Sequence, residues 1–175
     1  GTMGKNAEPG AGAIYRYYRG ELRQLLSGVT ISNSICFAPD GHMAYFCDTI
    51  AKQIMAIDLD ANGWPVGAVR TVVDLRDTGE CPDGSVVDAT GNIWNAQWGA
   101  SRVACYSPDG QFVTAVDVPA VHVTCPAFAG ATGQMFVTSA TEGLQGDDLN
   151  PATGNGQTFT VTVNAIGQRE HQVRL

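Results

Sequence analysis

The 175-residue sequence predicts an all-β fold of repeated four-stranded units, on the basis of three observations. Almost no segment keeps the 3.6-residue apolar period of an amphipathic helix. The 21 glycines are spread along the chain, which suits many short strands joined by tight turns. A phrase consisting of an apolar strand, a turn with glycine and a second apolar strand also recurs.

The recurring phrase begins at Phe37, Val87 and Phe128, so its copies start 50 and then 41 residues apart. Outer hairpins follow the first two copies, formed by residues 54–59 with 69–73 and by 103–106 with 112–116. Four strands in about 40 to 50 residues is the period of a β-propeller blade. A β-sandwich would also contain hairpins, but it would not need the repeating phrase.

The N-terminal part predicts one more hairpin, from residues 13–18 and 22–26. We prefer this hairpin to a helix because Gly20 lies in the middle of the segment. With the three repeats it gives about four blades, while residues 1–12 resemble a strand end and a loop. We therefore expect residues 1–175 to form a single β-propeller domain that is incomplete at its N-terminus.

Composition and charge exclude several classes of function. A content of 44% hydrophobic and 15% charged residues is typical of a folded globular protein. The net charge of −7 argues against nucleic acid as a partner, and no apolar stretch reaches the roughly 18 residues of a membrane helix. Five cysteines without a Cys-x-x-Cys pair predict buried free thiols in a reducing cytoplasm.

Several familiar motifs fail on inspection. Residues 58–63 match the opening of an EF-hand calcium loop, but Val69 stands where a glutamate belongs, so a hairpin turn is the better interpretation. Residues 10–12 lack the third glycine of a dinucleotide fingerprint, and there is no Gly-x-Ser-x-Gly elbow. The three histidines have no companion at metal-ligand spacing, and they are His42, His122 and His171.

Two polar residues stand where each repeat expects a strand to begin near the propeller axis. Asn33 lies four residues before Phe37, and Asp83 lies four residues before Val87. Equivalent positions in successive blades point into the same central channel, so an amide oxygen and a carboxylate would face each other there. Hard cations take such oxygen ligands. A Pro-Asp-Gly sequence such as 82–84 can also be only a turn, and spacing alone does not choose between the two readings.

An ordered set of motifs identifies a family resemblance. The motifs are Gly1-Thr-Met3, Ile31-Ser-Asn33, Phe37-Ala-Pro-Asp-Gly41, Cys81-Pro-Asp-Gly84, Gly91-Asn-Ile-Trp94 and Gln97-Trp-Gly-Ala-Ser-Arg-Val103. Together they resemble the senescence-marker-protein-30, gluconolactonase and regucalcin family, from Gly1 to about Val163. The resemblance implies a six-bladed propeller, of which this chain would be the C-terminal part.

The resemblance also implies a site and a reaction. Members hydrolyse sugar lactones with one divalent metal ion, here Ca²⁺ or Zn²⁺, with Mn²⁺ and Mg²⁺ as further candidates. Asn33 would be a metal ligand and Asp83 both a ligand and the catalytic acid/base, while Lys5 or Asn6 would contact the substrate. The family's third ligand, a glutamate, and its Arg-x-Asn substrate motif would lie upstream of Gly1.

The partner implied is a small-molecule sugar lactone, in a cytoplasmic protein that binds neither nucleic acid nor a membrane. The oligomeric state stays open. Two alternatives also stay open: a non-catalytic propeller that binds a metal or a partner protein, and a related esterase for aryl esters or organophosphates.

Overall fold

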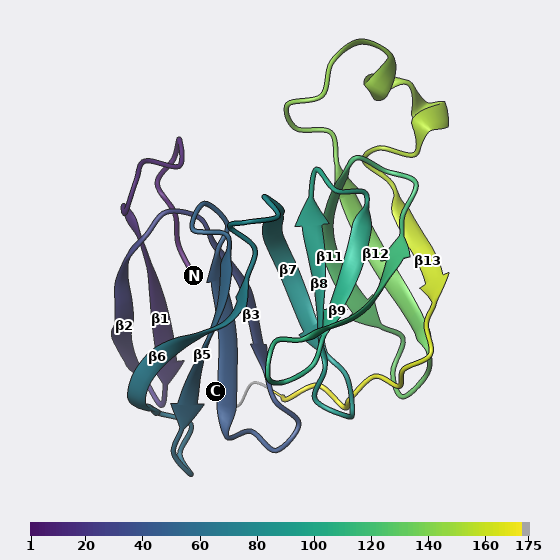
Figure 1. Cartoon of the computed structure of the whole chain (residues 1–175). Coiled ribbons are helices and arrows are strands. Elements are labelled where there is room, and N and C mark those ends of the chain that lie inside the picture. Colours follow the sequence, from purple (N-terminus) through teal and green to yellow (C-terminus); the bar gives the residue numbers. More distant parts are fainter. Residues whose placement is uncertain (173–175) are drawn as a thin grey trace.

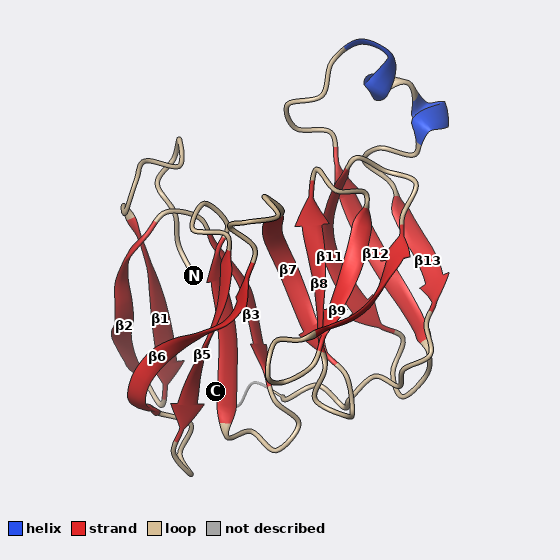
Figure 2. Ribbon diagram, in the orientation of Figure 1, coloured by secondary structure: helices blue, strands red, loops and turns tan. Residues whose placement is uncertain are grey.

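The computed structural model describes residues 1–172 and consists almost entirely of antiparallel strands (Figures 1 and 2). The strands are β1 (Gly12–Tyr18), β2 (Glu21–Val29), β3 (Ser32–Phe37), β4 (Met43–Asp48), β5 (Gln53–Leu59), β6 (Pro65–Asp74), β7 (Cys81–Val87), β8 (Ile93–Trp98), β9 (Arg102–Tyr106), β10 (Phe112–Asp117), β11 (His122–Phe128), β12 (Gln134–Ala140) and β13 (Thr158–Thr162). The short 3-10 helices η1 (Gly146–Leu149) and η2 (Pro151–Thr153) lie between β12 and β13. Within the described residues, no helix is long and apolar enough to cross a membrane.

The strands form four successive groups, which are the blades or part-blades of a propeller. β1 pairs with β2, and β3 to β6 form a four-stranded sheet in chain order. β7 to β10 repeat that order, and β11 to β13 follow, joined to β8 where His122 pairs with Trp98. The predicted four-stranded repeat is confirmed for the two central units. The hairpin predicted at residues 13–26 is β1 and β2.

The third repeat departs from the prediction of a full unit, because it holds three strands. Between β12 and β13 the chain leaves the sheet at residues 141–157, which project beyond the upper end of the blade in Figure 1. Asn155 ties this excursion back, since its Oδ1 accepts a hydrogen bond from the Val121 backbone at 2.7 Å. After β13 the chain runs along the lower ends of the blades instead of returning as a fourth strand (Figure 1).

Turn chemistry explains where the outer hairpins reverse. The Asp60 carboxylate accepts the backbone N–H of Asn62 at 2.8 Å and that of Trp64 at 2.9 Å, and Gly63 adopts a φ of 72°. Residues 60–64 are therefore the turn between β5 and β6, and residues 58–63 form the end of β5 and this hairpin turn, as the sequence predicts.

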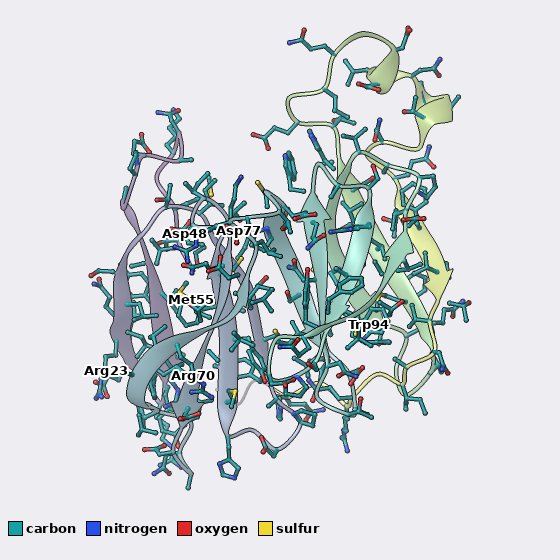
Figure 3. The ribbon with its side chains drawn as sticks, in the orientation of Figure 1. Arg23, Asp48, Met55, Arg70, Asp77 and Trp94 are labelled. Atoms are coloured by element: carbon teal, nitrogen blue, oxygen red, sulfur yellow. The ribbon has the colours of Figure 1, made fainter. Side chains whose placement is uncertain are left out.

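Apolar side chains alternate along the strands and fill the spaces between blades. In β8, Ile93 joins a core shared with the β3–β6 blade, whereas Trp94 and Ala96 join a core shared with the β11–β13 blade. Trp94, labelled in Figure 3, also donates its indole N–H to the buried carboxylate of Asp88 at 2.9 Å. Because the two central blades have an apolar core on both faces, neighbouring blades stabilise one another by removing apolar area from water.

The first strand of each blade is the inner one. β7 packs between β3 and β11, and the three strands line a common cavity of about 320 Å³. The C-terminal segment crosses the lower end of this cavity, where the Gln168 side chain donates to the Phe37 carbonyl at 3.0 Å. The inner strands therefore converge on one axis, as a propeller requires.

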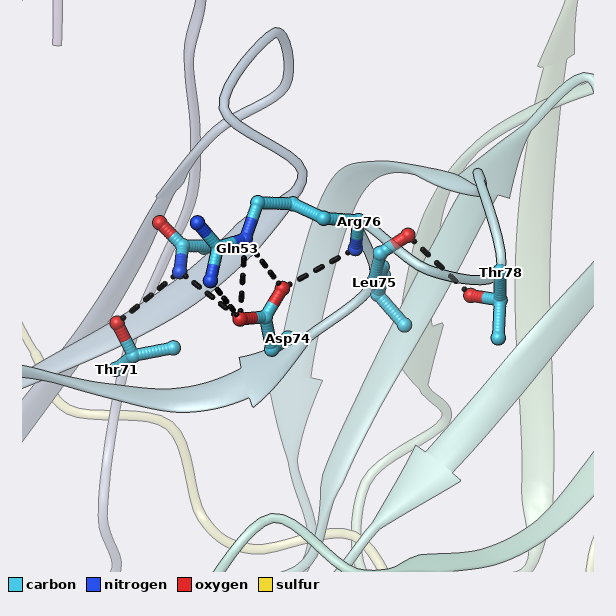
Figure 4. A network of polar contacts seen from close by, with 6 residues as sticks. All are labelled: Gln53, Thr71, Asp74, Leu75, Arg76 and Thr78. Carbon is cyan, nitrogen blue, oxygen red and sulfur yellow. Dashed lines mark hydrogen bonds and ion pairs between the residues drawn. The ribbon is translucent and has the colours of Figure 1, made fainter.

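The connection from β6 to β7 is held by a local polar network, shown in Figure 4. The Arg76 guanidinium donates through Nε to both carboxylate oxygens of Asp74, at 2.9 and 3.1 Å. These hydrogen bonds lower the pKa of Asp74 to about 2. Leu75, between them, is buried, and its carbonyl accepts the Thr78 hydroxyl at 3.3 Å. The network fixes the path by which the chain enters the next inner strand.

All five cysteines are free thiols, as predicted. Cys36, Cys47 and Cys105 are buried, and burial raises the pKa of both Cys47 and Cys105 to about 12. The expectation of burial is wrong for the remaining two, because Cys81 is half-buried and Cys125 is exposed. Both lie on inner strands, where one face opens toward the axis.

Candidate functional site

The structure places Asn33 and Asp83 at equivalent β-bulges on neighbouring inner strands. The pairing of β3 with β4 shifts register between Asn33 and Cys36, and the pairing of β7 with β8 shifts between Pro82 and Ser85. A bulge adds a residue to one strand and changes the direction in which its side chains point. Both blades thus carry a β-bulge at the position that the sequence spacing singled out.

The segment leading into β3 is fixed by Asp48, labelled in Figure 3. Its carboxylate accepts the backbone N–H of Thr30 at 2.8 Å and that of Ile31 at 3.0 Å. Ile31 also bridges to Met3, so the N-terminal residues are tied to the start of the inner strand. These contacts hold Asn33 in place from the upstream side.

A chain of hydrogen bonds orients the Asn33 amide. Its Nδ2 donates to the Thr49 hydroxyl at 3.0 Å, and that hydroxyl donates to the Pro82 carbonyl at 2.7 Å. Because the Thr49 hydroxyl donates its only proton to Pro82, it can only accept a hydrogen bond from Asn33. The Asn33 atom that faces Thr49 is therefore the amide nitrogen. Within residues 1–172, Asn33 Oδ1 accepts no hydrogen bond, so it is left available for a ligand.

A second set of hydrogen bonds holds the backbone at Asp83. Ser34, which adopts a left-handed φ of 59°, donates its hydroxyl to the Asp83 carbonyl and lies 2.8 Å from the Ser85 hydroxyl. Asn95 is fully buried, and its Nδ2 lies 3.0 Å from Ser85 Oγ and 3.3 Å from the carbonyls of Asp83 and Gly84. Side chains from two blades thus fix the backbone beneath the Asp83 carboxylate.

Sequence reasoning did not single out Ser34, Thr49 or Asn95. A weak signal existed for Asn95, which interrupts the otherwise apolar start of β8, and for Ser34, which directly follows Asn33. Residues that orient metal ligands in this way commonly have a strong effect on metal affinity, although they do not touch the metal themselves.

The electrostatics at Asp83 favour a cation. Burial raises the pKa of Asp83 to about 6, opposed in part by the Gly84 backbone N–H. Among the described residues, no Lys, Arg or His side chain forms an ion pair with this carboxylate. A desolvated carboxylate without a positive neighbour is stabilised by a bound metal ion, and the free Asn33 oxygen is a matching donor.

The two residues do not complete a coordination shell. No cluster of three or more His, Cys, Asp or Glu side chains suited to a metal occurs in the described part of the chain. Asn33 and Asp83 therefore fit a divalent cation as part of its ligand set, and the other ligands must come from water, substrate or further protein groups.

Lys5 and Asn6 lie in the exposed loop that precedes β1. Asn6 is hydrogen-bonded to Glu8 through both its backbone N–H and its Nδ2, each at 3.1 Å. The loop is attached beside the start of β3, because the Gly10 N–H donates to the Thr30 hydroxyl at 3.1 Å. Neither Lys5 nor Asn6 hydrogen-bonds to Asn33 or Asp83, so the structure brings the loop to this end of the blades without joining it to the pair.

Comparison with known proteins covers nearly the whole chain. A protein of Rhizobium meliloti (strain 1021), provisionally named a sugar lactone lactonase, is 45% identical over 100% of this chain and 60% of the relative. The L-arabinolactonase of Azospirillum brasilense is 39% identical over 95% of this chain and 56% of the relative. The chain thus spans between 56% and 60% of the length of these two relatives.

Solved structures share the fold. The crystal structure of a calcium-binding protein, regucalcin, from Agrobacterium tumefaciens matches with a TM-score of 0.92 and 41% identity, over 99% of this chain and 59% of that one. A luciferin-regenerating enzyme matches with a TM-score of 0.85 and 25% identity, over 99% of this chain and 60% of that one. The blades described above are therefore part of a propeller of this type.

A family model covers most of the chain as well. The model described as the SMP-30/Gluconolactonase/LRE-like region matches residues 1–141, which include both inner-strand bulges and the predicted pair of oxygen ligands. The chain belongs to the SMP-30/gluconolactonase/LRE-like family.

Proposed function

We propose that this chain is part of a metal-dependent sugar lactonase, in which Asn33 and Asp83 bind one divalent cation. The observation that carries the proposal is the arrangement of this pair: a free amide oxygen and an unpaired, partly buried carboxylate lie on equivalent bulges of neighbouring strands. Relatives named as lactonases give the reaction class.

The proposed reaction is hydrolysis of the ring ester of an aldonolactone. A divalent cation at this site would polarise the lactone carbonyl and the attacking water. Asp83 takes a proton from the water as the water oxygen bonds to the carbonyl carbon. Asp83 then returns that proton to the ring oxygen as the carbon–oxygen bond breaks, which yields the open hydroxy acid. Asn33 and the hydrogen bonds to the Asp83 backbone hold these groups in position.

The donor atoms favour a hard cation. An amide oxygen and a carboxylate suit Ca²⁺, and Zn²⁺, Mn²⁺ or Mg²⁺ also accept such ligands. The similar structure from Agrobacterium tumefaciens is described as a calcium-binding protein, which supports Ca²⁺ as the first ion to test. The free thiols suit a reducing cytoplasm as the place of action.

The remaining parts of the site belong to the same proposal. Lys5 or Asn6 would contact the substrate from the loop beside β3. Further blades, forming a single propeller domain with residues 1–175, would supply a glutamate ligand and an Arg-x-Asn motif. The share of the relatives that this chain spans leaves room for those blades.

The test compares two copies of one tripeptide in the full-length protein. Asp83→Asn keeps the side-chain volume but removes the base, so kcat on a panel of pentono- and hexonolactones should fall by about 10³-fold or more. Asp109→Asn, in the exposed Pro-Asp-Gly turn at 108–110, is the matched control and should retain wild-type turnover.

Three results would overturn the proposal. Normal lactone hydrolysis by Asp83→Asn would remove Asp83 from the mechanism. Tight binding of Ca²⁺ without turnover of any lactone would instead indicate a non-catalytic metal-binding propeller. Turnover confined to aryl esters or organophosphates would point to the related esterase class.

A further inference from the structure

Thr124 holds in β11 the place that Asn33 and Asp83 hold in β3 and β7. It lies four residues before Phe128, the apolar residue that begins its repeat phrase. The pairing of β11 with β12 shifts register between Val123 and Cys125, so the third inner strand carries a bulge at the same level. In each of the three strands, the residues that line the shared cavity come at or just after the bulge, so the three bulges lie at the same end of the strands.

The backbone around Thr124 is in direct contact with the Asp83 segment. A Cβ placed on Gly84 would lie 2.7 Å from the Thr124 carbonyl oxygen and 2.8 Å from Cys125 Sγ. The Asp83 charge also adds to the burial that raises the pKa of the Cys125 thiol. Thr124 is therefore a close neighbour of the candidate catalytic carboxylate, on the side opposite Asn33.

The hydroxyl protons decide what Thr124 can bind. The Thr138 hydroxyl lies 3.3 Å from the Cys125 carbonyl oxygen, to which it can also donate. Thr124 Oγ1 and Thr138 Oγ1 lie 2.7 Å apart, and either hydroxyl can be the donor of the hydrogen bond between them. Whichever hydroxyl donates, the Thr124 oxygen keeps at least one lone pair that can accept a further hydrogen bond.

We infer that Thr124 is a substrate-binding residue whose Oγ1 accepts a hydrogen bond from a hydroxyl of the sugar lactone. This inference rests on the proposed lactonase function. The ester oxygens of a lactone carry no hydrogen, so they cannot satisfy this acceptor, whereas each ring or side-chain hydroxyl can. Thr124 thus favours hydroxylated lactones over unsubstituted rings of the same size.

The experiment measures Thr124→Val in the full-length protein, on a sugar lactone and on δ-valerolactone. With the sugar lactone, KM should rise about tenfold while kcat changes little, because one uniform binding contact is lost. With δ-valerolactone, kcat/KM should stay within about twofold of the wild-type value. Thr124→Ser should restore the sugar-lactone KM, and Thr160→Val, an exposed threonine of β13, serves as the control for a lost hydroxyl in the same blade.

Calorimetric titrations with gluconate and with Ca²⁺ measure the contribution of the same contact to binding, without any turnover. Thr124→Val should weaken gluconate about tenfold and leave Ca²⁺ affinity unchanged. An equal loss on both lactones, a loss of Ca²⁺ affinity, or no loss at all would overturn the inference. If the wild-type protein hydrolyses no lactone but still binds gluconate through Thr124, the proposed lactonase function fails while the substrate contact stands.

Discussion

The tripeptide Pro-Asp-Gly occurs both in an inner strand, at 82–84, and in an outer turn, at 108–110, and the two copies behave differently. Pro82 is buried, and burial raises the pKa of Asp83 to about 6. Asp109 is exposed, and its carboxylate accepts the hydroxyl of Ser107 within its own turn. The same three residues therefore give a candidate ligand in one place and a turn in the other.

The two glycines differ as well. Gly110 has a left-handed φ of 84°, which a turn requires, and a Cβ there would also meet the Val72 carbonyl oxygen. Gly84 does not adopt a positive φ; it is needed because β11 passes so close that a Cβ would meet the Thr124 carbonyl oxygen at 2.7 Å. Neighbouring blades, and not the tripeptide itself, thus determine what Asp83 can do.

The two Pro-Asp-Gly copies differ because of what surrounds them. The largest effect should therefore come from substituting Asn95, which surrounds Asp83 but lies outside the tripeptide. Asn95→Leu removes the buried donor that serves Ser34, Ser85 and two carbonyls. We expect the free energy of unfolding to fall by about 3 kcal/mol, with Ca²⁺ affinity of the full-length protein falling about tenfold. Chemical denaturation and calorimetry measure the two quantities.

The control for Asn95 is Asn62→Leu in the exposed β5–β6 turn, which should change stability by less than about 0.5 kcal/mol. If Asn95→Leu left Ca²⁺ affinity unchanged, the network would serve only the packing of the blades, and its role in positioning Asp83 would be lost.

A smaller difference in the free energy of unfolding is expected between alanine substitutions at Gly84 and at Gly41. Gly84→Ala forces a Cβ against the backbone of β11 and should cost about 2 kcal/mol of unfolding free energy. Gly41→Ala, in the Pro-Asp-Gly turn at 39–41, places its Cβ in ordinary contact with the His171 ring at 3.9 Å, so it should lose only the cost of its φ of 73°, about 1 kcal/mol. Thermal denaturation compares them. A greater loss for Gly41→Ala would contradict the close approach of β11 to Gly84.

Much of the fold follows from local signals. Turn residues such as Asp60 and Gly63, and the alternation of apolar residues, predicted the hairpins because they act within a few residues of each other. The third repeat was overpredicted as a full unit, since residues 141–157 interrupt it and no local signal shows that the chain then leaves the sheet.

The candidate site was predicted only in part. Spacing from Phe37 and Val87 located Asn33 and Asp83, because strands repeated in successive blades share a register. The contacts of Thr49 and Asn95 cross between blades or strands far apart in sequence, so no local pattern reveals them. Thr124 has the same spacing signal, but threonine is common in strands and does not stand out.

The central claim is that Asn33 and Asp83 together bind one divalent cation, and anomalous diffraction tests it most directly. Crystals of the full-length protein soaked in Mn²⁺ should show a single strong peak within about 2.6 Å of both Asn33 Oδ1 and an Asp83 carboxylate oxygen. A peak away from these two atoms, or an Asn33 amide turned so that Nδ2 faces the ion, would contradict the account.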